Sequence, residues 1–117
     1  MLIFKIVQAP EWRDADSVGF FAGSPKDKAD GFMHLSTAAQ VAGTLAKYYA
    51  GERRLLLVGV DPAMLGSNLR FEPSRDGVLF PHLYGTLPLS AARWAKPLEL
   101  DQEGKFVLPA ELAAARS

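Results

Sequence analysis

The sequence predicts a single α+β domain in which short strands outnumber helices. Three observations lead to this expectation. Apolar runs too short for helices recur along the chain, one stretch from about residue 38 to residue 49 has helical spacing, and no repeat or low-complexity linker divides the 117 residues. A chain of this length can bury one modest core, so we expect one domain over residues 1–117.

The first third of the chain predicts two strands and a short helix. Residues 2–7 are mostly apolar and branched, which is typical of an opening strand. Pro10 fits the first turn of a short helix that carries Trp12, because proline loses no helical hydrogen bond there. Residues 26–31 are polar and end in Asp-Gly, which indicates a loop. Residues 32–35 are a short apolar run and predict a second strand.

The clearest helix follows, over about residues 38–49. Thr37 and Gln40 have the spacing of a capping box, and Gly51 supplies a stop signal. Apolar side chains recur one and two helical turns apart and predict a buried stripe made of Val41, Leu45 and Tyr48.

The second half of the chain is expected to be mainly extended, with strands at residues 55–60, 69–72, 78–84, 91–100 and 106–108. The first of these is continuously apolar, as in a strand covered on both faces. The second and third flank a loop at 73–77. Pro97 places the fourth at a sheet edge, and Glu103-Gly104 indicates a hairpin before the fifth. The alanine-rich tail at residues 109–116 fits either a terminal helical turn or a frayed end.

The charge balance argues against some partners without excluding them, and the composition excludes some kinds of site. Thirteen Lys and Arg residues balance thirteen Asp and Glu residues, so no net field favours nucleic acid or an anionic membrane as a partner. The absence of cysteine excludes disulfides, thiolate metal sites and cysteine nucleophiles. Residues 1–4 do not resemble a signal peptide, and no apolar run reaches membrane-spanning length. We therefore expect a cytoplasmic protein with no membrane partner.

The two histidines of the chain stand in similar surroundings. The motifs are Phe-Met-His-Leu-Ser around His34 and Phe-Pro-His-Leu-Tyr-Gly around His82. A hydroxyl residue, Ser36 or Tyr84, follows each histidine at two-residue spacing, and side chains at that spacing share one face of a strand. If the two strands are neighbours, four polar groups lie on the floor of one pocket.

This arrangement makes His34 and His82 the candidate catalytic residues. The candidate ligand-binding residues are Ser36, Thr37, Arg70, Glu72, Tyr84 and Gly85. The alternative is that each histidine only satisfies a nearby backbone group. No phosphate-binding glycine loop, Gly-x-Ser-x-Gly or His-Glu-x-x-His motif occurs to decide between them.

Several of these residues also have a purely structural explanation. Ser36 and Thr37 precede the helix, where free N–H groups can hold a phosphate, but capping alone explains both. Arg70 and Glu72 share a strand face and equally fit a solvated ion pair. Two distant histidines and one carboxylate are a weak signal for a metal, and we expect none.

The motifs Asp-Gly-Phe-Met-His-Leu-Ser and Phe-Pro-His-Leu-Tyr-Gly resemble the signatures of the bacterial domain-of-unknown-function family 952, and the resemblance spans nearly the whole chain. That family is grouped with the ADP-ribosyltransferase-like fold. The resemblance therefore implies an ADP-ribosylation-like split mixed β-structure, with one main helix after the His34 strand and an NAD cleft between two small sheets.

The segment from residue 33 to residue 79 is also similar in order to the tRNA 2′-phosphotransferase family. On that match His34 takes the place of the histidine that contacts the NAD-like ligand. The chain departs from that family in its arginines, because Tyr48-Tyr49-Ala50-Gly51 stands where one is expected, and Arg53 and Arg54 are shifted. No glutamate matches the late-strand glutamate of toxin-type ADP-ribosyltransferases.

Two functions follow from these expectations. The first is an enzyme of ADP-ribosyl or phosphoryl transfer with an NAD-like nucleotide as its small-molecule ligand, in which a histidine orients the ribose and a tyrosine stacks on a ring. The second is a non-catalytic ligand-binding or interaction domain that retains the fold without the activity. The missing glutamate and arginines favour the second, or a novel activity.

Overall fold

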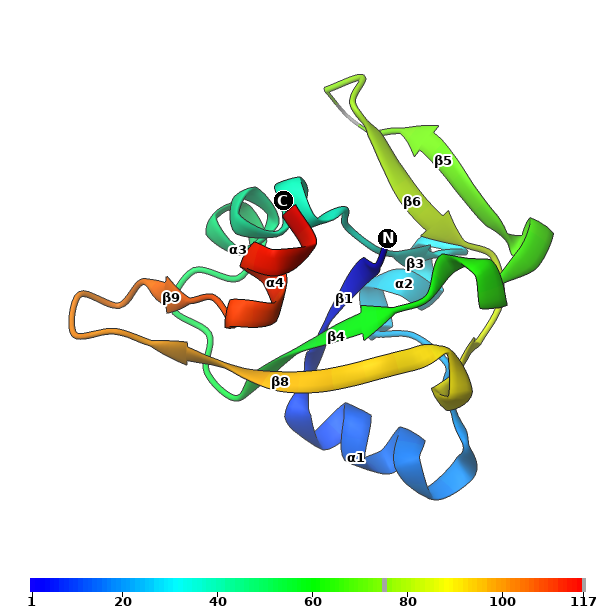
Figure 1. Cartoon of the computed structure of the whole chain (residues 1–117). Coiled ribbons are helices and arrows are strands. Elements are labelled where there is room, and N and C mark those ends of the chain that lie inside the picture. Colours follow the sequence, from blue (N-terminus) through cyan, green and yellow to red (C-terminus); the bar gives the residue numbers. More distant parts are fainter. Residues whose placement is uncertain (75, 117) are drawn as a thin grey trace.

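A four-stranded antiparallel sheet forms the centre of the computed structural model, which describes residues 1–74 and 76–116 (Figure 1). Its spatial order is β1-β4-β8-β9. The strands are β1 Ile3–Gln8, β4 Leu55–Val60, β8 Ala92–Leu100 and β9 Phe106–Val107. Each lies where the sequence predicts a strand, and β4 has the predicted bounds. In the described part of the chain β9 pairs with β8 only at Glu99 and Leu100, so Pro97 lies on a stretch whose outer side is free.

A second, three-stranded sheet carries both histidine motifs, in the order β3-β6-β5. Its strands are β3 Met33–His34, β5 Leu69–Pro73 and β6 Leu79–Leu83, and a separate ribbon pairs β2 Phe20–Phe21 with β7 Leu87–Pro88. The α+β class is confirmed. The expected mixed β-structure is wrong for the described strands, because every pairing among them is antiparallel. Arg75, in the predicted loop between β5 and β6, lies outside the described residues.

The α-helices of the described chain are α1 Ala9–Val18, α2 Pro25–Asp30, α3 Val41–Tyr48 and α4 Ala110–Arg116. Short 3₁₀ turns cover Ala38–Gln40, Pro62–Met64, Gly66–Asn68 and Leu89–Ala91. The predicted helix is confirmed, since Thr37 and Gln40 form a capping box ahead of α3. The expectation of one main helix is wrong, because α1 has 10 residues and α3 only 8.

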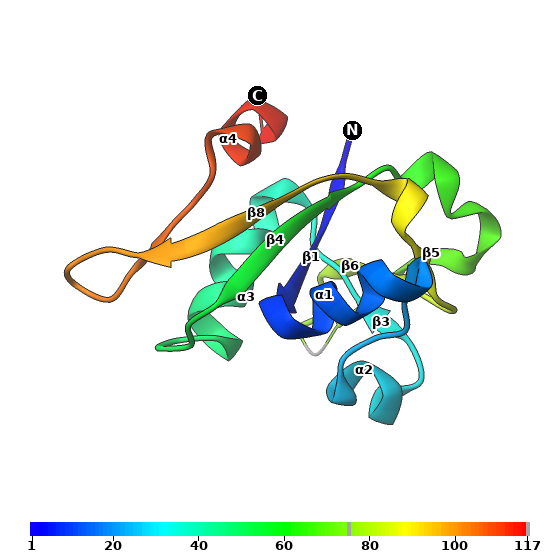
Figure 2. The same ribbon diagram turned by 90° about the horizontal axis from the view of Figure 1, so that it is seen from below.

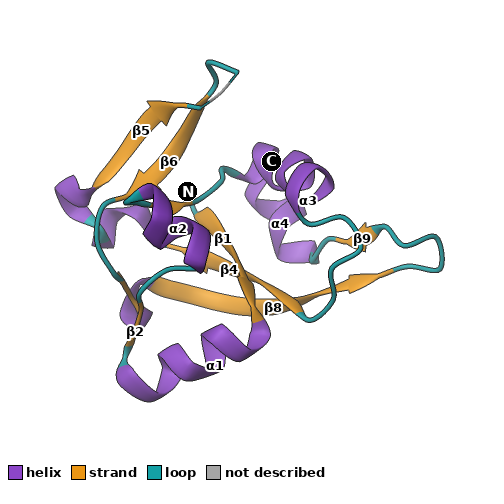
Figure 3. Ribbon diagram, turned by 180° about the vertical axis from the view of Figure 1, so that it is seen from behind, coloured by secondary structure: helices purple, strands orange, loops and turns teal. Residues whose placement is uncertain are grey.

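Helix α2 replaces the polar loop expected at residues 26–31, which corrects that prediction. Ser24 and Asp27 form a reciprocal capping box, in which each side chain accepts the other residue's backbone N–H at 3.2 and 2.9 Å. Pro25 occupies the first turn, and Gly31 ends the helix in the left-handed region at φ 85°. In Figures 1 and 2, α2 lies beside β3, and Figure 3 shows that the β5–β6 hairpin projects beyond the central sheet.

The two faces of the central sheet bury side chains in two different cores. On one face Ile3 and Val7 pack in a core shared with α1 and the smaller sheets, and on the other face Phe4 and Ile6 pack with α3 and α4. Figure 2 shows α1 and α4 on either side of the sheet. Alternate side chains of β1 therefore belong to different cores. None of the described helices is long and apolar enough to cross a membrane.

Candidate functional site

His34 and His82 lie directly opposite each other in the antiparallel pair β3–β6. Their ring centroids are 5.9 Å apart, and the ring of Phe32 lies near both, with centroids 4.7 Å from His34 and 4.1 Å from His82. The prediction that the two motifs occupy adjacent strands is confirmed. The apolar residues around each histidine favour a short strand, and the pairing of β3 with β6 brings the two imidazoles together.

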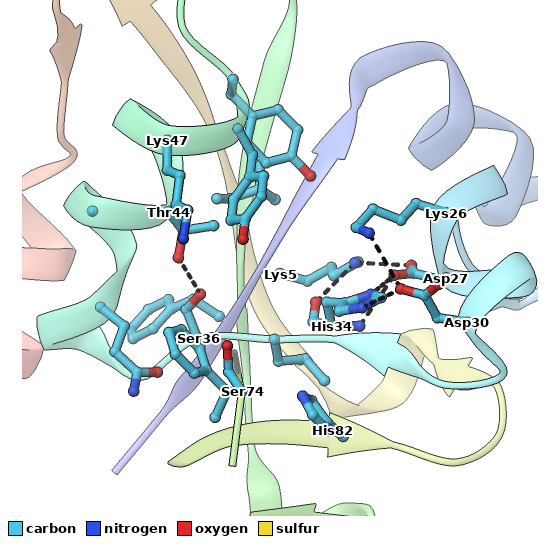
Figure 4. A pocket seen from close by; sticks show the side chains of 18 of the residues that line it. Lys5, Lys26, Asp27, Asp30, His34, Ser36, Thr44, Lys47, Ser74 and His82 are labelled. Carbon is cyan, nitrogen blue, oxygen red and sulfur yellow. Dashed lines mark hydrogen bonds and ion pairs between the residues drawn. The ribbon is translucent and has the colours of Figure 1, made fainter. Parts of the chain in front are cut away.

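Both histidines line a cavity of about 610 Å³ between α3 on one side and α2 with β3 on the other (Figure 4). The cavity lies beside β1, which is the edge strand of the central sheet. Ser36 closes one end of that free edge by exchanging backbone hydrogen bonds with Phe4 at 2.8 and 2.9 Å. The peptide groups of Phe4 therefore point away from β4, and by strand alternation those of Ile6 point the same way, into the cavity wall.

His34 is held between two carboxylates from α2. Its Nδ1 is 2.6 Å from Oδ1 of Asp27, and its Nε2 is 3.0 Å from Oδ2 of Asp30. The Asp27 contact is a hydrogen bond, and Asp30, which is 38% exposed, lies at ion-pair distance from the other ring nitrogen. Both ring nitrogens of His34 are thus engaged by the protein itself.

Asp27 connects His34 to a buried lysine. Nζ of Lys5 lies 2.9 Å from Oδ2 of Asp27 and donates to the backbone carbonyl of His34 at 2.8 Å, and both charged side chains are less than 5% exposed. Burial alone would raise the pKa of Asp27, but the hydrogen bond from His34 and the charge of Lys5 outweigh it and hold that pKa well below its usual range. For Lys5 burial is the larger effect, so its pKa is lowered despite the attraction of Asp27.

The opposite wall of the cavity comes from α3. Ser36 and Thr44 share a hydrogen bond of 3.2 Å, and Nζ of Lys47 lies 3.7 Å from Oδ2 of Asp76, in the β5–β6 connection. Tyr49 is half-buried, and burial with the nearby charge of Asp27 raises its pKa to about 12. This wall therefore offers hydroxyls, a lysine and tyrosine rings to anything that enters.

His82 has a different partner from His34. Its Nδ1 is 2.8 Å from Oε1 of Glu72, and the Tyr84 hydroxyl donates to the same oxygen at 2.6 Å. These two hydrogen bonds lower the pKa of Glu72, and the one from Tyr84 has the larger effect. The guanidinium of Arg70 lies 5.2 Å from the centre of the Tyr84 ring. Arg70 and Glu72 thus both contact Tyr84, Arg70 at the face of the ring and Glu72 at the hydroxyl.

Of the predicted site residues, three line the cavity: His34, Ser36 and His82. The remaining predicted residues lie outside its lining in the described chain; they are Thr37, Arg70, Glu72, Tyr84 and Gly85. Thr37 caps the 3₁₀ turn ahead of α3. Tyr84 points to the same side as His82, as predicted, since both contact Oε1 of Glu72, but it follows the end of β6 and lies outside the cavity lining.

Sequence reasoning missed the charged residues that hold His34. A lysine inside the apolar strand at residues 2–7 is a signal that could have marked Lys5, because a buried lysine requires a partner. Asp27 and Asp30 were assigned to a loop, although Ser24 stands three residues before Asp27 as in a capping box.

Comparisons with known proteins identify relatives of the chain. The model of the family DUF952, described as a protein of unknown function, matches residues 6–95. The crystal structure of protein CC0527 from Caulobacter crescentus is similar over 97% of this chain and 99% of its own, with 42% identity and a TM-score of 0.90. A solution NMR structure of CC0527 covers 97% of both chains with a TM-score of 0.85. No curated protein matches the chain.

Proposed function

The chain belongs to the DUF952 family, and we propose that its cavity binds a nucleotide-type ligand such as NAD or ADP-ribose. The observation that carries this proposal is the cavity, whose volume of about 610 Å³ is in the range of small-molecule sites. Its lining combines ammonium groups, hydroxyls and aromatic rings, which suit phosphates, ribose and a base. We propose an ADP-ribosylation-like fold together with this function; the division of the strands into separate sheets beside the cavity supports it, although their antiparallel pairing departs from the mixed arrangement that the resemblance implies.

Each wall of the cavity fits a different part of such a ligand. Lys26 and Lys47 stand on opposite sides and can pair with phosphates. Tyr48, about half exposed, can stack on a nicotinamide or adenine ring, the role expected of a tyrosine in such a cleft. The outward N–H and C=O of Ile6 complement a carboxamide or an adenine edge, which present one donor and one acceptor side by side.

A specific observation favours the alternative of binding without turnover. Cleavage of a glycosidic bond develops positive charge that a nearby carboxylate stabilises. Within residues 1–74 and 76–116, each carboxylate that lines the cavity already faces a cationic or imidazole side chain: Asp27, Asp30 and Asp76. This engagement supports a ligand-binding domain more than an ADP-ribosyl or phosphoryl transferase.

Titration of the protein with NAD, followed by NMR of the histidine side chains, tests the proposal. We expect His34 and His82 to shift together at millimolar NAD, and His34→Ala to weaken binding by more than about 1 kcal/mol, because Asp27 and Asp30 lose the imidazole between them and repel the phosphates of NAD. If no nucleotide shifts either ring at that concentration, the proposal is wrong. Release of nicotinamide on prolonged incubation would separate a transferase from a binding domain.

Two lysines of α2 provide a matched control for the same titration. Lys26 lines the cavity and Lys28 does not. We expect Lys26→Ala to weaken NAD binding several-fold, roughly the value of one exposed charge–phosphate contact, and Lys28→Ala to leave it unchanged. Equal effects of both substitutions would indicate a general charge effect and not a site.

A further inference from the structure

The two histidines of the cavity differ in what they can offer a ligand. His34 has a carboxylate at each ring nitrogen, Asp27 at Nδ1 and Asp30 at Nε2. In the part of the chain that the structure describes, His82 has one carboxylate partner, Glu72, which lies at Nδ1. The two similar motifs therefore hold two chemically distinct imidazoles, whose ring centroids are 5.9 Å apart.

Glu72 decides which nitrogen of His82 carries the proton. An ionised carboxylate can only accept, so the 2.8 Å contact requires Nδ1 of His82 to donate. Tyr84 donates to the same Glu72 oxygen and Arg70 lies over the Tyr84 ring, and both contacts favour the ionised carboxylate. A neutral His82 ring is thereby held with its proton on Nδ1, which leaves a lone pair on Nε2.

Nε2 of His82 has no hydrogen-bond partner among the described residues, and no side-chain nitrogen or oxygen of those residues is both fully buried and unpaired. The atom is consequently accessible, although the residue is 7% exposed, and the cavity is the space that His82 lines. Phe32 packs on the face of the ring at a centroid distance of 4.1 Å and fixes its plane. The edge of the His82 ring is therefore fixed in the cavity lining, where Figure 4 shows this residue.

We propose that Nε2 of His82 accepts a hydrogen bond from a hydroxyl of the bound ligand, and that Glu72 is the positioning residue that sets this tautomer. His34 does not present an equivalent acceptor, since each of its ring nitrogens faces a carboxylate. The cavity thus selects ligands that carry a hydroxyl donor at this point, as the ribose of a nucleotide does. This inference rests on the proposed function for the identity of the ligand, but not for the state of the ring.

Nitrogen-15 NMR of the ligand-free protein tests the state of the ring directly. We expect the neutral form of His82 to be protonated on Nδ1, and Glu72→Ala to shift it toward the Nε2-protonated form. Glu72→Gln should preserve the Nδ1 proton, because the amide oxygen still accepts. The signals of His34 serve as an internal control for folding. An Nε2-protonated His82 in the unaltered protein, or a tautomer that Glu72→Ala does not change, would overturn the inference.

NAD binding to His82→Phe then tests the acceptor. Phenylalanine keeps the ring that stacks on Phe32 and removes the lone pair, so we expect affinity to fall roughly three- to tenfold, the worth of one hydrogen bond. Unchanged affinity would overturn the inference while leaving the proposed function in place. If NAD does not bind the unaltered protein, the proposed function is wrong. The nitrogen-15 NMR measurement of the His82 tautomer then tests by itself whether Nε2 is a hydrogen-bond acceptor.

Discussion

At the scale of single residues, Asp27 ties together three segments that are distant in the sequence. Its two oxygens accept from the backbone N–H groups of Ser24 and His34, from the His34 ring and from Lys5. A carboxylate that is 4% exposed is tolerated only when its charge is compensated, and here Lys5 provides the compensation. The same side chain caps α2, orients the imidazole of His34 and neutralises a buried ammonium.

Removing the Asp27 carboxylate should destabilise the protein strongly. Asp27→Ala leaves Lys5 buried without its partner, so we expect the free energy of unfolding to fall by about 3–5 kcal/mol. Asp30→Ala is the control, because Asp30 is 38% exposed and its removal should cost less than about 1 kcal/mol. Urea denaturation of both variants gives the comparison, and similar losses would show that Asp27 does not act through Lys5.

Acid should weaken the fold through the same carboxylate. The pKa of Asp27 is lowered in the folded state, so its contribution is present above the ordinary aspartate pKa near 4 and is lost as the pH falls below that value. In that window the unfolded chain binds the proton first, and the free energy of unfolding should fall by up to about 1.4 kcal/mol per pH unit on account of this group. Asp27→Asn should show a correspondingly smaller slope, and equal slopes would contradict the assignment.

At the scale of elements, the helix predicted from its periodicity packs against one face of the central sheet through part of its predicted stripe. Val41 and Leu45 are almost fully buried, whereas Tyr48, the third residue of the predicted stripe, is 48% exposed and lines the cavity. The stripe therefore drives the packing of α3 through its first two residues. The third residue, Tyr48, contributes to the candidate site and not to the core.

Truncation within this stripe tests its contribution to stability. Leu45→Ala should cost about 2–5 kcal/mol, because Leu45 is 2% exposed and a cavity would remain. Leu79→Ala is the matched control, since Leu79 is 52% exposed and little apolar surface is lost from the core. Thermal or urea unfolding that shows no loss for Leu45→Ala would mean that this face of α3 does not support the core.

Two glycines should respond to alanine in opposite directions. A Cβ at Gly59 in β4 would lie 2.7 Å from Cε2 of Trp94, so we expect Gly59→Ala to cost about 1–3 kcal/mol through overpacking. A Cβ at Gly43 in α3 meets no described atom within 4 Å, and Gly43→Ala should stabilise the helix by up to about 1 kcal/mol. Unfolding free energies of the same sign would contradict the close approach of Trp94.

At the scale of the whole molecule, the cavity lies where β1 has no second neighbouring strand among residues 1–74 and 76–116. Its side chains alternate between two cores, one under α1 and one under α3, and its other edge faces the space between α3 and α2. The bridge to Ser36 closes one end of that edge, and β3 then brings the histidine pair alongside. The candidate site is thus built where the two layers of the protein meet.

The sequence by itself determined where most of the strands lie along the chain, the capped helix at α3 and the place of each histidine on a short strand, whereas the pairing of those two strands was decided by the tertiary structure. The first three depend on local signals, because alternation, helical spacing and capping act between residues that are near in the chain. Only the tertiary structure decided which charged groups complete the site. Lys5, Asp27 and Glu72 act on the histidines through contacts across elements, and such contacts depend on the packing of β1 against α2 and of β5 against β6, which no local pattern specifies.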